Sequence, residues 1–179
     1  MSIKSQSNGI LLNVTWKPAS IYGLPDATLY NTKMSFEKKT MSFDVALPSL
    51  TLSGPHKVTG RILLLPITGS GPSKIVLTNA TLHIAMNWPI HVGADGKEYV
   101  SVGDGEVKIT RCDLLEIELQ GLFNGHKVLG AEMNKILNQN WRLLHQELSP
   151  SVANRIFEEF RKVIEILLKN VPVTDLFAP

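Results

Sequence analysis

The last third of the sequence constrains the fold most. Residues 122–171 open with Leu-Phe-Asn-Gly and then carry apolar residues in steps of mostly three and four. This spacing places side chains on one face of an α-helix. The face is wide, because Leu143, Phe157 and Ile166 fall outside a narrow seam, so the helix needs cover on more than one side. The pattern predicts a long helix over residues 124–171 that is covered by a curved sheet or by another hydrophobic partner.

The start of this helix and an interruption within it have local signatures. Asn124 is a suitable N-cap, and Phe123 and Val128 stand at the positions of a hydrophobic staple. Ser149 and Pro150 resemble a fresh N-cap followed by proline at the first helical position. The run is therefore two helices or one helix kinked at Pro150, and we favour the kinked helix.

The preceding residues, 1–121, predict antiparallel strands. Turn residues separate short runs that alternate between apolar and polar side chains. The expected strands are 9–17, 27–36, 41–47, 49–53, 56–67, 74–88, 99–102, 107–112 and 114–119, with a loop at 18–25 and turns at Gly54-Pro55, Gly69–Pro72, Asp95-Gly96 and Asp104-Gly105. Because no repeat or linker is visible, we expect one α+β domain over residues 1–179, with a strongly curved antiparallel sheet wrapped around the C-terminal helix.

Charge and hydropathy exclude two classes of partner. The 179 residues include 18 Lys and Arg against 16 Asp and Glu, for a formal net charge of +2. The basic residues are scattered singly, which argues against nucleic acid. The longest apolar runs, such as residues 62–65, are far shorter than the roughly 20 residues of a membrane-spanning helix. We expect a soluble protein, and a monomer.

Catalytic and metal-binding signals are weak. The single Cys112 excludes an intrachain disulfide and a multi-thiolate metal site, and a buried thiol is favoured over a reactive one. The five histidines form no metal-ligand spacing, and residues 69–74 lack the Gly-Lys-Ser/Thr ending of a phosphate loop. We therefore expect no enzyme, no metal and no cofactor, with an esterase for a lipid-like substrate as the weakest alternative.

Two sequons are candidate glycosylation sites. They begin at Asn13 and Asn79, each followed by Thr two residues later. In the predicted strands the apolar residues share one face, and both asparagines point to the other. Both sequons should therefore lie on the outer surface, a position compatible with a secreted glycoprotein. Residues 1–9 lack the apolar core of about 7–15 residues that marks a signal peptide.

The inward faces of the strands and the helix predict an apolar tunnel. The expected lining comprises Leu12, Val14, Trp16, Phe43, Val45, Ile62, Leu64, Leu82, Ile84, Met86, Trp88, Met133, Leu137, Trp141, Leu144, Phe157 and Phe160. For any one of these residues a plain core role is favoured, but Met and Trp together on so broad a helix favour a cavity. Burying about 350 Å² of a terpenoid-sized ligand would contribute roughly 9 kcal/mol before association costs, enough for micromolar affinity. His56, His83, Tyr30 or Asn87 could supply a polar anchor, although a surface or structural role is favoured for each.

Several motifs, in order, resemble the insect takeout and haemolymph juvenile hormone binding protein family. They are the stretch 54–71, the Leu122-Phe123-Asn124-Gly125 motif, the stretch 133–141 and the closing stretch 172–177. The resemblance implies a curved antiparallel sheet around a long helix, which together enclose a tunnel for a small lipophilic ligand. It also implies secretion, and an association with hormone or odorant transport, feeding and circadian output.

The resemblance further implies a missing front segment. Family members begin with a signal peptide, a paired-cysteine loop, a first helix and further strands, so by this comparison the chain is truncated at its N-terminus. We expect a soluble extracellular carrier that binds a terpenoid, a fatty acid or a similar lipid. The alternative is an interaction protein that docks a partner or a lipid surface through its amphipathic helix.

Overall fold

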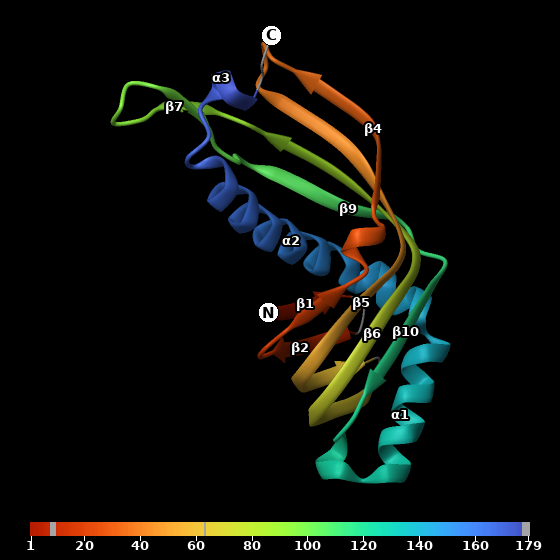
Figure 1. Cartoon of the computed structure of the whole chain (residues 1–179). Helices are drawn as coiled ribbons and strands as arrows, with labels where there is room; N and C mark the ends of the chain where they lie inside the picture. Colours follow the sequence, from red (N-terminus) through yellow and green to blue (C-terminus); the bar gives the residue numbers. More distant parts are fainter. Residues whose placement is uncertain (8–9, 63, 177–179) are drawn as a thin grey trace.

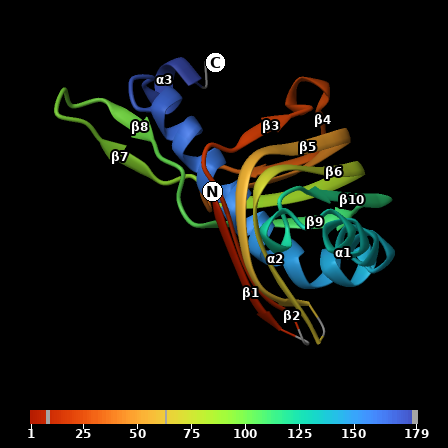
Figure 2. The same ribbon diagram turned by 90° about the horizontal axis from the view of Figure 1, so that it is seen from below.

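A large, strongly curved antiparallel sheet bends around the C-terminal helices (Figures 1 and 2). This computed structural model describes residues 1–7, 10–62 and 64–176. The main path of the sheet is β1-β2-β5-β6-β10, while β3 and β4 pair with β5, and β9 pairs with β6. The predicted fold class is confirmed. Gly9, Leu63 and Phe177, which belong to predicted strands and to the closing motif, lie outside the described residues.

The sheet strands are β1 (Ser2–Ser7), β2 (Ile10–Trp16), β3 (Ser20–Tyr22), β4 (Thr28–Ser35), β5 (Thr40–Ile62), β6 (Leu65–Asn87), β9 (Gly105–Arg111) and β10 (Leu114–Leu119). A separate hairpin consists of β7 (Ile90–Val92) and β8 (Glu98–Val100), closed by the predicted turn at Asp95-Gly96, where Gly93 N donates to Lys97 O over 2.8 Å. The helical segments are η1 (Leu24–Asp26), η2 (Phe123–Gly125), α1 (Lys127–Gln139), α2 (Trp141–Leu168) and α3 (Val173–Leu176). The predicted loop at 18–25 thus includes β3 and part of η1.

One long hairpin, β5 with β6, forms the backbone of the sheet. The two strands pair from Thr40 opposite Asn87 to Ile62 opposite Leu65. The predicted turns at Gly54-Pro55 and Gly69–Pro72 are therefore wrong. Pro55 lies directly opposite Pro72, so the two residues that lack an N–H donor fall at the same place in the ladder. Both strands therefore carry Gly and Pro at mid-strand positions, where a straight strand rarely has either residue.

Two glycines in β5 allow neighbouring segments of the same chain to approach closely. Gly60 has φ 145°, and a Cβ there would lie 1.9 Å from the carbonyl oxygen of Leu11. Gly54 has φ 146°, and a Cβ there would lie 2.4 Å from the carbonyl oxygen of Pro18. Only glycine combines this backbone conformation with so short an approach. These glycines permit close strand packing in the curved sheet and do not form turns.

The helical run breaks at Asn140 and not at Pro150. Asn140 has φ −105° and ψ 22°, and its side-chain amide donates to Ile136 O over 2.8 Å. A short amide side chain that bonds to nearby backbone competes with helix continuation. Pro150 lies inside α2. The run is therefore two helices that point in different directions (Figure 1), which corrects the prediction of one helix over 124–171.

The predicted helix start is also displaced. Asn124 lies in η2 with φ 56°, and the N-cap of α1 is His126, whose Nδ1 accepts from Leu129 N over 3.3 Å. Val128 is 67% exposed, so it forms no hydrophobic staple with Phe123. In the part of the chain that the structure describes, none of the helices is long and apolar enough to span a membrane.

Two asparagines of α1 bind the edge of β10. Asn138 accepts from Ile117 N over 2.8 Å and donates to Ile117 O over 2.7 Å. Asn134 does the same with Leu119, at 2.9 and 2.8 Å. Four helical residues advance by about 6 Å, close to the roughly 6.8 Å between alternate strand residues. The two asparagines therefore provide hydrogen-bond partners for backbone N–H and C=O groups that would otherwise be unpaired at the edge of β10.

Candidate functional site

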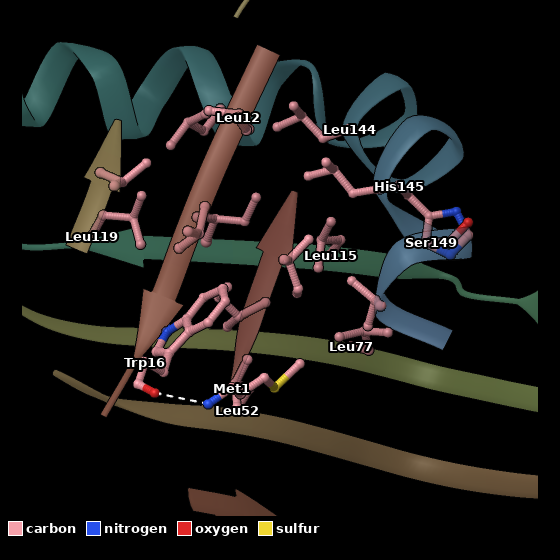
Figure 3. A pocket seen from close by; sticks show the side chains of 18 of the residues that line it. Met1, Leu12, Trp16, Leu52, Leu77, Leu115, Leu119, Leu144, His145 and Ser149 are labelled. Atoms are coloured by element: carbon pink, nitrogen blue, oxygen red, sulfur yellow. Dashed lines mark hydrogen bonds between the residues drawn. The ribbon is translucent and has the colours of Figure 1, made fainter. Parts of the chain in front are cut away.

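An apolar cavity of about 120 Å³ lies between the inner face of the sheet and the helices (Figure 3). Its lining comes from β1, β2, β3, β5, β6, β9, β10, α1 and α2. The lining residues are Met1, Ile3, Leu12, Val14, Trp16, Ile21, Leu50, Leu52, Val58, Ile62, Ile67, Ile75, Leu77, Ile109, Leu115, Ile117, Leu119, Leu137, Leu144, His145, Leu148, Ser149, Val152 and Ile156.

The lining contains no Lys, Arg, Asp or Glu side chain. The indole N–H of Trp16 donates to Ser73 Oγ over 2.9 Å, and Ser73 Oγ donates in turn to Gly54 O over 2.8 Å. The α-amino group of Met1 donates to the carbonyl oxygen of Trp16 over 2.9 Å (Figure 3). Most of the wall is aliphatic, and the indole nitrogen within it already has a partner.

His145 and Ser149 add the other polar side chains of the wall. They are four residues apart on α2 and lie side by side at one end of the cavity (Figure 3). Nε2 of His145 is buried and has no hydrogen-bond partner among the described residues. Burial lowers the pKa of His145, because desolvation penalises the charged imidazolium. The imidazole at this end of the cavity is therefore neutral near pH 7.

Six of the predicted lining residues line this cavity in the structure. They are Leu12, Val14, Trp16, Ile62, Leu137 and Leu144. Their strand or helix phase places them on the inner face, and all six are nearly fully buried. Whether they contact a ligand stays a prediction.

Most of the other predicted lining residues belong to the core beyond the cavity. Phe43, Leu82, Ile84, Trp88, Met133 and Phe157 are buried but do not line it. Val45, Met86, Trp141 and Phe160 are partly buried and pack against the core. The strand phase placed these residues inside but could not show which end of the long sheet is hollow.

The prediction that Leu64 lines the cavity is wrong. It is 86% exposed, because it lies between the paired residues Ile62 and Leu65 at the tip of the β5–β6 hairpin. The alternation had placed it inward, since the turn was predicted several residues later.

The prediction did not include two sets of cavity-lining residues, one on β10 and one on α2. Leu115, Ile117 and Leu119 of β10 alternate with charged or exposed residues and line the cavity. On α2, Leu148, Val152 and Ile156 continue the same wall in steps of four. Both sets carry the periodicity of a half-buried element, so the signal was present, but pattern alone could not assign it to this space.

The proposed polar anchors lie elsewhere. His56 is buried, and its Nδ1 donates to Gly71 O over 2.7 Å; burial lowers its pKa. His56 is not part of the cavity lining. Tyr30 is 39% exposed. Asn87 borders a second, open hollow of about 560 Å³ whose wall mixes methionines with Lys33, Asp104 and Glu106.

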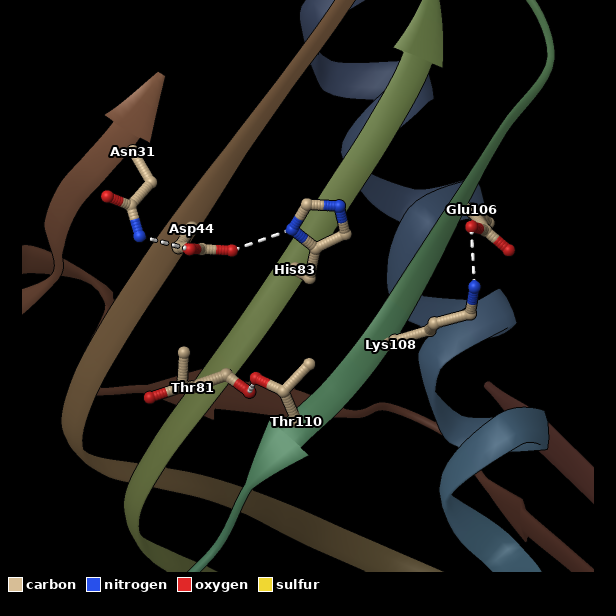
Figure 4. Close-up of polar contacts among 7 residues, drawn as sticks. All are labelled: Asn31, Asp44, Thr81, His83, Glu106, Lys108 and Thr110. Atoms are coloured by element: carbon tan, nitrogen blue, oxygen red, sulfur yellow. Dashed lines mark hydrogen bonds and ion pairs between the residues drawn. The ribbon is translucent and has the colours of Figure 1, made fainter. Parts of the chain in front are cut away.

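His83 belongs to a polar network on the sheet (Figure 4). Its Nδ1 lies 2.7 Å from Asp44 Oδ1, and Asn31 donates to Asp44 Oδ2 over 2.8 Å. The hydrogen bonds from Asn31 and then His83 hold the pKa of Asp44 below its usual value. Thr110 donates to Thr81 O over 3.2 Å in the same region. The network of Asn31, Asp44 and His83 links strands β4, β5 and β6, and His83 is engaged there.

The two sequon asparagines are exposed, in agreement with their strand phase. Asn13 points outward from β2, and Asn79 Nδ2 donates to Asp113 Oδ2 over 3.0 Å. Cys112 is half-buried, donates to Leu114 O over 3.3 Å, and has a pKa raised chiefly by burial. Within residues 1–7, 10–62 and 64–176, no group of three or more His, Cys, Asp and Glu side chains is placed to hold a metal ion.

Comparison with known proteins relates this chain to two proteins of the fruit fly genus. The circadian clock-controlled protein daywake of Drosophila melanogaster is 24% identical over 176 residues, which cover 96% of this chain and 67% of that protein. Its counterpart in Drosophila yakuba is 23% identical with the same coverage.

Structure and family comparisons agree with this relationship. The crystal structure of Takeout 1 from Epiphyas postvittana matches with a TM-score of 0.80 and 30% sequence identity, covering 97% of this chain and 81% of that one. The sequence model of the haemolymph juvenile hormone binding protein family matches residues 1–178. The chain belongs to the haemolymph juvenile hormone binding protein family, a family of carriers for small hydrophobic ligands.

Proposed function

We propose that this protein carries a small hydrophobic ligand in the cavity between its sheet and its helices. The observation that carries the proposal is the cavity wall, which is mostly aliphatic and contains no Lys, Arg, Asp or Glu side chain. Such a space stays dry without a ligand and gains contacts when an apolar molecule fills it.

The size of the cavity limits what it holds without rearrangement. An apolar cavity of about 150 Å³ holds one benzene molecule, which has six non-hydrogen atoms, so 120 Å³ accommodates about five. Only the end of a short fatty or terpenoid chain meets this limit. A full sesquiterpenoid exceeds it and would require the partly buried side chains of α2 to move outward.

Mass spectrometry and fluorescence test the proposal together. Protein purified under mild conditions should show a bound lipid in native mass spectrometry, and organic extraction should release it. After the lipid is removed, titration with a terpenoid should change the emission of Trp16, which lines the cavity, whereas Trp141 does not. The change should vanish in Trp16→Phe and persist in the matched control Trp141→Phe. Protein that contains no lipid and takes none up would contradict the carrier function.

Secretion, glycosylation and circadian control form the finer part of the proposal. Family membership supports an extracellular protein, and the exposure of Asn13 and Asn79 makes both available to glycosylation. The similarity to proteins named as clock-controlled supports a link to circadian or feeding physiology. Treatment of the native protein with an N-glycosidase should lower its mass, and its transcript should oscillate over a light–dark cycle. Size-exclusion chromatography with light scattering should show a monomer.

A second candidate function is docking to a lipid surface through α2. Val163, Ile166 and Leu167 are 58, 65 and 62% exposed on this helix. An apolar strip of this kind favours contact with a partner or with a membrane surface. Co-sedimentation with neutral lipid vesicles, lost in a triple Ser variant of these residues, would support docking; unchanged sedimentation would exclude a role for this strip.

A further inference from the structure

Two hairpins at one end of the sheet carry exposed leucines at their tips. The β1–β2 and β5–β6 hairpins project there side by side (Figures 1 and 2), and Ile10 of β2 lies opposite Ile62 of β5. Leu64 is 86% exposed, more than any other large apolar side chain that the structure describes, and Leu11 and Leu65 are 48 and 40% exposed. Clustered exposure of this kind marks an interaction surface. We call Leu11, Leu64 and Leu65 the leucine tip.

Three exposed cations lie behind the leucine tip. Arg61 is directly opposite Leu11 on one side and Pro66 on the other. Lys57 lies on the same face of β5, about 14 Å further along the strand, and Lys4 of β1 is also exposed. None of the three cations forms an ion pair with another described residue. We call Lys4, Lys57 and Arg61 the basic collar, and all three are available to an anionic partner.

The strands that form this end contain no acidic residue. Residues 1–25 and 45–94 include five Lys and Arg but no Asp or Glu, although the whole chain has 16 acidic residues. Among the strands paired with the β5–β6 hairpin, the nearest acid is Glu118 of β10, which lies opposite Lys74. Lys74 is nine residues from Leu65, or about 30 Å along the strand. This end is therefore locally positive in a protein whose net charge is only +2.

This combination of shape and charge favours a lipid surface over a protein partner. Three leucines at a projecting tip offer far less area than the roughly 800 Å² that each partner contributes to a stable protein interface. A bilayer needs no matching shape, because leucine side chains enter its acyl region while anionic headgroups attract the nearby cations. Arg61 can reach the headgroups while its aliphatic stem stays beside Leu11.

We propose that this end of the protein docks to an anionic phospholipid surface, with the leucine tip inserted among the acyl chains and the basic collar bound to the lipid phosphates. The inference goes beyond the carrier function and does not depend on it. It also differs from docking through α2, because the exposed apolar strip of α2 lies in the C-terminal half of that helix, at the opposite end of the molecule from the hairpin tips (Figure 1).

Co-sedimentation of the full, unglycosylated chain with lipid vesicles tests the docking. One set of vesicles is phosphatidylcholine alone, and the other contains about 30% phosphatidylserine. The wild type should bind the anionic set at least about tenfold more tightly, and this preference should shrink when the salt concentration rises from about 0.1 to about 0.5 M. The chain is used without glycans because Asn13, two residues from Leu11 on the same face of β2, would carry a glycan beside the tip.

Matched serine variants test the leucine tip. Leu64→Ser with Leu65→Ser should weaken binding to the anionic vesicles about tenfold, because less apolar surface leaves water. Ile166→Ser with Leu167→Ser removes two exposed side chains of the α2 strip and should change binding by less than about twofold. All four positions are exposed, so circular dichroism should show the same fold in both variants.

Matched glutamine variants test the basic collar. Lys57→Gln with Arg61→Gln should weaken binding to the anionic vesicles about tenfold and leave binding to the neutral vesicles unchanged. Lys97→Gln with Lys169→Gln removes the same charge from the β7–β8 turn and from the end of α2. This control should change binding by less than about twofold.

Fluorescence measures insertion directly. The emission of Leu64→Trp should shift to shorter wavelength on anionic vesicles, because the indole leaves water for the acyl region. Val92→Trp places an indole at a 67% exposed position of β7, away from the hairpin tips, and its emission should not shift.

Several results would overturn the inference. They are a wild type that binds neutral and anionic vesicles equally or binds neither, serine variants at the tip that bind like the wild type, and an equal loss in the α2 control. Binding that depends on the basic collar but not on the leucine tip would show attraction by charge alone and would overturn insertion. Ligand uptake should be the same in the wild type and the tip variants, since Leu64 and Leu65 do not line the cavity, so a failure of docking leaves the carrier function intact.

Discussion

The two ends of the curved sheet both pack against the helices, but different kinds of side chain lie between sheet and helix at each end. At the cavity end, defined by β1, β2, β10, α1 and the first half of α2, the inward side chains are mostly aliphatic and surround the 120 Å³ cavity. At the aromatic end, defined by β4, residues 105–107 of β9 and the neighbouring parts of β5 and β6, Phe43, Trp88 and Phe157 are buried. The ring tip of Phe157 lies so near Gly105 that a Cβ there would be 2.6 Å away.

This difference shows how one fold can hold both a core and a binding space. Large planar rings occupy the gap between helix and sheet at the aromatic end, whereas branched aliphatic side chains stop short of one another at the cavity end. Phe157 of α2 illustrates the first case, since it is 5% exposed and its ring lies against β9 at Gly105. Stability and ligand capacity should therefore depend on different ends of the molecule.

The largest effect should come from a matched pair of leucine truncations. Leu82→Ala removes a buried side chain away from the cavity and should cost about 3–5 kcal/mol of unfolding free energy. Leu115→Ala borders a space that is already empty, so it loses fewer contacts and should cost about 2–3 kcal/mol. Urea denaturation measures both. Equal losses would show that the two ends are packed alike.

The next effect should come from the edge of β10 at the cavity end. Asn138→Ala leaves the N–H and C=O of Ile117 without their side-chain partner, and it should cost about 1–3 kcal/mol. Lys135→Ala, at an exposed position of the same helix, is the control and should change stability by less than about 0.5 kcal/mol. Amide hydrogen exchange at Ile117 should accelerate in the first variant alone, and unchanged protection would contradict the edge role.

Filling the cavity should separate ligand capacity from stability. Ile75→Phe adds volume to a lining position and should abolish ligand uptake while changing stability by no more than about 1 kcal/mol. Ile84→Phe adds the same volume to a core position outside the lining, where overpacking should cost about 1–3 kcal/mol and leave uptake unchanged. Calorimetry and ligand titration on both variants provide the test. Retained uptake in Ile75→Phe would place the ligand elsewhere.

The smallest effect should be a loss of stability in mild acid. Burial lowers the pKa of His56 and of His145 in the folded protein, below the ordinary value of about 6.5. The unfolded chain therefore binds more protons in this range, and stability should fall as the pH drops from 7 towards 5. Thermal unfolding at several pH values measures the trend, and the double variant His56→Leu, His145→Leu should flatten it. A rise in stability towards pH 5 would contradict neutral, buried imidazoles.

Local patterns predicted the elements better than their ends. The alternation at 10–16 and 114–119 and the helical period after residue 126 all correspond to real elements. Gly54, Pro55, Gly69 and Pro72 misled the prediction, because the same residues that form turns also permit bends inside paired strands. The break at Asn140 was likewise missed, since Pro150 gives the stronger local signal for an interruption.

The sequence by itself determined the buried face of most strands and helices, because a period of two or of 3.6 assigns residues to a face whatever the neighbours are. It also carried the family motifs, and with them the fold class. Only the tertiary structure decided where the inner face is hollow and which side chains meet across it. These facts depend on contacts between elements far apart in the chain, and the spacing of residues along one element contains no information about them.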